Sequence, residues 1–302
     1  MAAQHRFDSI DYSSVSYLAQ LRNKLFLTAS VLALLLTPAC SSKPLVDKET
    51  ETSATVATFR WITSKYKLLE DPETTQLLER VTSRLHSASQ LPSSRLALKN
   101  LSNSDSKFTP PEHWQLFVID DSQANAFSAG SGIVLITRAM IVATSSEAEL
   151  AAVISHEISH QLLGHTREAL AEAQAREIST SEQPASSPNH SNKQPPGYSL
   201  SQELDADTMS LSLLYSAGYN LQHSISSLAL GFRQNAMDTD FGYSRMNPTL
   251  ESQKLDSKLP PAWLSQRVSN LQQKIVTYGN ISQATENSRE FNRVRRILMA
   301  IS

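Results

Sequence analysis

A short histidine motif in the middle of the chain has the residue types and spacing of a metal site. His156 and His160 are four positions apart, and Glu157 directly follows the first histidine. Residues four apart lie on one face of a helix, so both imidazoles can reach the same ion. Zinc suits such a pair because it binds imidazole well and keeps an open coordination position. Glu157 lies one step around the helix and is placed to act as general base and general acid in a hydrolysis.

A second, acidic motif could complete this site. A catalytic zinc ion takes three protein ligands, and Glu203 and Asp207 are again four positions apart. One carboxylate could bind the metal while the other orients a ligand histidine. Alternatively, both acids only complement the dipole at the start of a helix. Spacing alone does not decide between these two interpretations.

The zinc motif lies on the most strongly periodic segment of the chain. Apolar residues recur every three or four positions, which predicts one long helix over residues 145–173. Pro72 and the acidic residues beside it start another predicted helix, and β-branched and aromatic residues predict two strands. The fold class is therefore α+β and mostly helical, with a small sheet. The other predicted helices cover 201–217, 221–233 and a pair after 261, and the strands cover 114–119 and 133–137.

Composition excludes few functions. The chain has 302 residues and a net charge of −2, so it lacks the basic surplus of a nucleic-acid-binding protein. Cys40 is its only cysteine, which excludes an intramolecular disulfide and a cysteine-rich metal cluster.

The N-terminal region has the parts of a bacterial lipoprotein signal. Arg22 and Lys24 precede an apolar run over 25–36, and Cys40 follows it. This run is too short to cross a bilayer comfortably, since a spanning helix needs about 20 apolar residues. We predict a signal peptide over 1–39, lipid modification of Cys40 and a tether over 40–56. The protein would then face the periplasm, held to a membrane, with the outer membrane favoured.

Residues 57–302 form the predicted catalytic domain. Within it, residues 179–200 are rich in Ser, Pro, Asn and Gln and predict a mobile loop. Residues 87–112 also have loop composition, and 237–262 form a Pro- and Asp-containing linker. Whether this linker covers the site as a lid does not follow from the sequence.

Several stretches together resemble the gluzincin zinc metallopeptidases, the family of HtpX, BepA and the CAAX prenyl endopeptidase, and most closely its small periplasmic lipoprotein members. Similar segments occur in the family's order. They are Asn125-Ala126-Phe127 with residues 130–138, Ser146 to Ser155 ahead of the zinc motif, Glu203 to Asp207, and Ala217 to Asn220.

The resemblance implies a zincin-like fold with one zinc ion per chain. It implies that Glu203 is the third ligand and that Asp207 supports His156. It also implies that Gly132, Ile133, Val134 and Leu135 belong to an edge strand on which an extended substrate lies. An exposed edge offers unpaired backbone groups to any extended chain.

One family feature is missing. Family members often carry a His-Pro pair ahead of an Arg in a later helix. The possible equivalents here are Asn247-Pro248 and Pro260-Pro261, and neither has the histidine. Tyr243, Arg267 or His165 could supply the missing donor. Helical spacing predicts that His165 projects on a different side of the long helix from the ligand pair.

The predicted function is that of a zinc endopeptidase acting on unfolded or misassembled envelope proteins. A zinc-bearing chaperone or assembly factor that binds clients without cutting them is the main alternative. The intact Glu157 counts against it, because a pure binding module has no use for a general base. A hydrolase of a non-protein envelope component is a further alternative, disfavoured by an edge strand suited to peptide.

Overall fold

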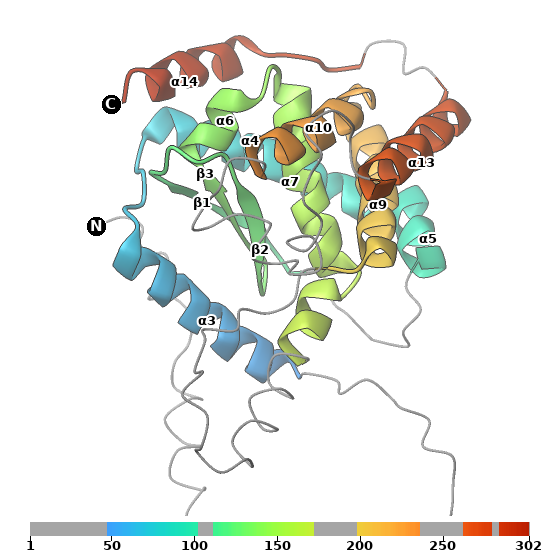
Figure 1. Cartoon of the computed structure of the whole chain (residues 1–302), viewed down its shortest axis with the longest axis horizontal. Coiled ribbons are helices and arrows are strands. Elements are labelled where there is room, and N and C mark those ends of the chain that lie inside the picture. Colours follow the sequence, from blue (N-terminus) through green and yellow to red (C-terminus); the bar gives the residue numbers. More distant parts are fainter. Residues whose placement is uncertain (1–46, 102–110, 172–197, 236–261, 280–283, 302) are drawn as a thin grey trace, which may run out of the picture. The chain divides into compact units, whose positions relative to one another are not determined.

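The computed structural model describes residues 47–101, 111–171, 198–235, 262–279 and 284–301 (Figure 1). Helices pack around a small sheet, which confirms the predicted α+β class. With the labels of Figure 1, the helices are α3 (Lys48–Lys65), α4 (Pro72–Ser89), α5 (Pro92–Leu101), α6 (Arg138–Ala143), α7 (Glu147–Leu162), α9 (Leu200–Ser216), α10 (His223–Asn235), α13 (Ala262–Tyr278) and α14 (Arg289–Met299); the strands are β1 (Gln115–Ile119), β2 (Ala126–Gly130) and β3 (Ile133–Thr137).

The sheet has the order β1-β3-β2, with β3 parallel to β1 and antiparallel to β2. The prediction that Gly132 to Leu135 form an edge strand is therefore wrong, because β3 has a partner on each side. The sequence did not indicate β2, since alanine, serine and glycine have low strand propensity. In the described part of the chain, β2 is the strand at the edge beside α7 (Figure 1).

The free side of β2 follows from its pairing. Thr137 N–H donates to Asn125 O at 2.9 Å, so the backbone of Asn125 points toward β3. Backbone direction alternates along an antiparallel strand. The polar backbone groups of Ala126 and Ser128 therefore point away from β3, toward the side where another extended chain could pair.

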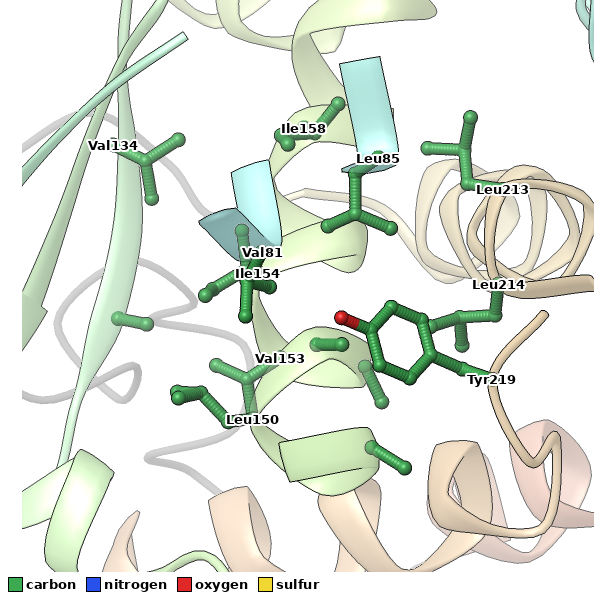
Figure 2. Close-up of a cluster of buried hydrophobic side chains, with 14 of the residues drawn as sticks. Val81, Leu85, Val134, Leu150, Val153, Ile154, Ile158, Leu213, Leu214 and Tyr219 are labelled. Atoms are coloured by element: carbon green, nitrogen blue, oxygen red, sulfur yellow. The ribbon is translucent and has the colours of Figure 1, made fainter. Parts of the chain in front are cut away.

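Helix α7 is the centre of the core. Ser146 caps it by accepting a hydrogen bond from Glu149 N–H, and nearly all of its side chains are buried. Figure 2 shows its apolar residues between strand β3 and helices α4 and α9. The labelled side chains are Val81, Leu85, Val134, Leu150, Val153, Ile154, Ile158, Leu213, Leu214 and Tyr219.

The predicted continuous helix over 145–173 is wrong. Helix α7 ends at Leu162, and Gly164 follows with φ of +79°. Glycine adopts this left-handed conformation without steric cost, which makes it the usual residue after a helix C-terminus. A separate helical stretch then covers 165–171. The chain changes direction between the zinc motif and His165.

Two predicted irregular regions contain helices. Helix α5 lies within 87–112, and α3 begins at Lys48, within the predicted tether. Glu51 and Thr55 of α3 are buried, and the Thr55 hydroxyl donates to Ala129 O at 2.9 Å. Glu51 accepts from Ser131 N–H. The predicted signal peptide and the rest of the tether, including Cys40, lie outside the described residues.

Among the described helices, none is both long enough and apolar enough to span a membrane.

A substitution in the core tests this packing. Leu85 of α4 is fully buried in the cluster of Figure 2, whereas Leu96 of α5 is 59% exposed. We expect Leu85→Ala to lower the free energy of unfolding by about 2–5 kcal/mol, from lost burial and the cavity left behind. Leu96→Ala should change it by no more than about 0.5 kcal/mol. Urea denaturation followed by circular dichroism measures both, and equal effects would contradict the described core.

Candidate metal centre and active site

Three side chains converge between α7 and α9. The Nε2 atoms of His156 and His160 are 3.1 Å apart. Glu203 places Oε2 3.3 Å from His156 Nε2 and Oε1 3.9 Å from His160 Nε2. Tetrahedral zinc with bonds of roughly 2.0–2.1 Å keeps its ligand atoms about 3.3 Å apart. These residues together could hold one metal ion, and their spacing fits zinc.

Asp207 fixes the orientation of His156. Its Oδ1 lies 3.1 Å from His156 Nδ1. An ionised carboxylate only accepts hydrogen bonds, so Nδ1 carries a hydrogen, and Nε2 is the ring nitrogen that faces Glu203 and is left to bind a metal. Burial alone would lower the pKa of His156, but the hydrogen bonds to Asp207 and Glu203 raise this pKa to about 10. The site therefore favours a positive charge at this ring, which a metal cation can supply.

Arg267 of α13 holds both carboxylates. Its Nε and Nη2 donate to Asp207 at 2.8 and 2.7 Å, and its Nη1 lies 2.6 Å from Glu203 Oε2. Burial alone would raise the pKa of Asp207, but the guanidinium lowers this pKa to about 2. Asp207 is therefore ionised at neutral pH. Arg267 was one candidate to replace the histidine of the missing His-Pro pair as a hydrogen-bond donor. Its guanidinium already binds Asp207 and Glu203, so it is not free for that role.

The charges of the site point to a divalent cation. The exposed fractions are 6% for Glu157, 4% for Glu203, 4% for Asp207 and 3% for Arg267. With all four ionised and the histidines neutral, as metal ligands must be, three carboxylates and one guanidinium leave two negative charges in a buried site. Burying unpaired charge costs several kcal/mol or more. A divalent ion between the histidines would neutralise this excess.

Glu157 has the environment of a general base. Burial raises its pKa to about 7, and a hydrogen bond from the Ser128 backbone of β2 partly opposes that rise. A pKa near neutrality suits a group that both accepts and returns a proton. A nearby cation would lower this pKa and favour the ionised form.

The outer face of His160 is covered by two aromatic rings. His165 Nδ1 lies 3.1 Å from His160 Nδ1, and the Tyr198 ring stacks on the His160 ring with centroids 3.7 Å apart. The predicted placement of His165 away from the ligands is wrong, because the break at Gly164 returns the chain to the site. That glycine, directly ahead of His165, was the available signal.

A chain of hydroxyl groups connects the Tyr198 ring to β2. Thr166 Oγ1 lies 3.1 Å from Tyr198 Oη and 3.1 Å from Ser128 Oγ. Burial raises the pKa of Tyr198 above its usual value, so the phenol stays neutral and hydrogen-bonded. No spacing in the sequence indicated Tyr198, Thr166 or Ser128, since they come from three separate segments.

The residues predicted to form a substrate-binding edge strand lie inside the sheet. Gly132 N–H donates to Gln161 Oε1, and Ile133 O accepts from Gln161 Nε2. These contacts fasten the start of β3 to α7, so Gly132 to Leu135 support the active-site helix from inside the sheet. The strand beside Glu157 is β2. Tyr243 and both candidate pairs at 247–248 and 260–261 lie outside the described residues.

Comparison with known families agrees with this geometry. Residues 88–188 match peptidase family M48. The matched segment is about one third of the chain and contains the sheet, α7 and both histidines. It ends before Glu203, whose assignment therefore depends on its position beside the histidines. No curated protein matches the chain.

The contact between His160 and His165 gives a testable prediction. Metal binding through His160 Nε2 requires the hydrogen on Nδ1, and His165 Nδ1 is then the acceptor. We expect His165→Leu to raise the zinc dissociation constant about 10–100-fold, as loss of such outer partners usually does. His165→Asn should retain most of the affinity, because its amide oxygen can accept the same hydrogen bond.

Competition with a chromogenic zinc chelator measures these constants. His113→Leu is the control, because His113 is exposed and outside the site. Equal zinc affinity in His165→Leu and the wild type would contradict this role for His165. Equally weak binding by both His165 variants would also contradict it.

Proposed function

We propose that the chain is a zinc-dependent endopeptidase of the M48 type. The observation that carries the proposal is the convergence of His156, His160 and Glu203 on one point, with Glu157 buried beside them. The match over residues 88–188 supports the same activity. One zinc ion per chain would be held by these three ligands.

Each group then has a defined task. His156, His160 and Glu203 would hold zinc, which would supply the Lewis acidity that polarises a peptide carbonyl and makes an attacking water more acidic. Glu157 accepts the proton of that water and returns it to the leaving amine. Asp207 holds His156 in the ligating tautomer, and Arg267 fixes the carboxylates of Asp207 and Glu203.

The substrate would be an extended peptide on the free edge of β2. Ala126 and Ser128 direct backbone groups away from β3, and the Ser128 backbone also contacts Glu157. A chain paired there would pass the general base. Main-chain hydrogen bonding recognises an extended conformation more than particular side chains, so unfolded segments are the favoured substrates.

The proposed setting is the cell envelope. Cys40 after a short apolar run supports a lipid anchor, a signal peptide over 1–39 and a periplasmic location at the outer membrane. The substrates would then be unfolded or misassembled envelope proteins. These proposals rest on the sequence pattern of residues outside the described part of the chain.

The alternative of a chaperone that binds clients without cutting them uses the same β2 edge. The buried Glu157 disfavours it, since keeping a carboxylate beside two other acids costs free energy that a binding module need not spend.

Replacement of the general base separates these functions. We expect Glu157→Gln to lower the rate of casein cleavage by at least about 100-fold while zinc content is unchanged. Glu79→Gln, an exposed change on α4, should cleave like the wild type. The assay uses full-length protein in mild detergent, with zinc measured in every sample. A zinc-loaded wild type that leaves casein intact would favour the chaperone alternative.

Metal removal tests the dependence on zinc. Dialysis against a strong chelator should abolish cleavage, and one equivalent of zinc should restore it, because no other described group supplies the Lewis acid. Magnesium, which prefers six oxygen ligands, should not restore cleavage. Undiminished cleavage by protein shown to be metal-free would exclude the mechanism.

A further inference from the structure

A cavity opens beside the catalytic residues and has no part in the chemistry described above. It has a volume of about 90 Å³ and extends from His156 and Glu157 between the start of β2, α7, α10 and α13. Figure 1 shows α10 and α13 beside α7 and α9. The walls of the cavity are mainly apolar, with side chains that include Met140, Val153, Leu228, Trp263 and Leu271.

The size of the cavity matches one large side chain. A water molecule needs about 10–15 Å³ of such volume, so the space corresponds to roughly six to nine waters. A phenylalanine or tyrosine side chain has about this many heavy atoms. Apolar walls hold water poorly, and an apolar side chain that displaces it gains free energy.

The wall also carries a polar group suited to a ligand. Ser224 is only 6% exposed, and its hydroxyl has no hydrogen-bond partner among the described residues. Buried hydroxyls normally have a partner. Arg267 also lines the cavity, but its guanidinium is engaged with Asp207 and Glu203 and does not attract an acidic side chain.

We propose that this cavity binds the side chain of a substrate residue next to the scissile bond and selects a large apolar side chain with a hydroxyl tip. Tyrosine is preferred to phenylalanine, because Ser224 bonds its phenol, and both are preferred to alanine. This inference rests on the proposed peptidase function and adds a preference to it: the β2 edge accepts any extended chain, and the cavity decides where that chain is cut.

Binding to an inactive protein tests the cavity apart from cleavage. Zinc-loaded, full-length Glu157→Gln is titrated by calorimetry with short peptides that differ at one position, which is Tyr, Phe or Ala. We expect tyrosine to bind about 10–100-fold more tightly than alanine, from apolar burial. It should bind about 3–10-fold more tightly than phenylalanine, from the added hydrogen bond.

Two further substitutions identify the binding place. Ser224→Ala should remove the preference for tyrosine over phenylalanine, whereas Ser226→Ala should not, since Ser226 lies on the same helix but does not line the cavity. Leu228→Trp fills the cavity and should bring the tyrosine peptide to the affinity of the alanine peptide. The ratio of the dissociation constants of two peptides is measured on the same protein sample, so it does not change if part of that sample is unfolded.

Equal affinity for the three peptides would overturn the proposal. It would also be overturned if selectivity survived both Ser224→Ala and Leu228→Trp. Selective binding that these substitutions abolish, in a protein whose wild type leaves casein intact, would support the cavity and contradict the peptidase function. Cleavage of casein together with unselective binding would do the reverse.

Discussion

The structure depends on a buried excess of negative charge beside two histidines. The guanidinium of Arg267 contacts Glu203 and Asp207, the carboxylate of Glu157 lies close by, and all four side chains are almost fully buried. Apolar surroundings make uncompensated charge costly. The arrangement becomes favourable when a divalent cation joins it, so metal binding and stability of the site are linked. The same excess explains why His156 favours a positive charge in the absence of a metal.

The elements of the fold can be understood from what they must position. Helix α7 is buried on nearly every side and carries two of the proposed ligands and the proposed base, so its packing fixes the site. Helix α9 brings Glu203 and Asp207 from its first two turns, and α13 brings Arg267. The turn at Gly164 returns His165 to His160. Strand β2 contributes the backbone of Ser128 on the open side of the same centre.

Local patterns in the sequence predicted the elements with strong signals. The spacing of His156 and His160, the periodic α7 segment and the strands at 115–119 and 133–137 were all indicated by residue type. Strand order was not, because pairing partners depend on contacts between distant segments; β3 was expected at the edge and lies at the centre. Weakly patterned elements such as β2 and α3 were missed for lack of β-branched residues or a clear apolar stripe. Tyr198 and the role of Arg267 also needed the tertiary structure.

The most direct test of the central claim is anomalous diffraction at the zinc absorption edge from crystals of the zinc-loaded protein. We predict a single strong peak bounded by His156 Nε2, His160 Nε2 and a Glu203 carboxylate oxygen, at about 2.0–2.2 Å from each. Glu157 should lie beside the ion without binding it. A peak away from these side chains, or no zinc in protein that has been incubated with it, would contradict the account.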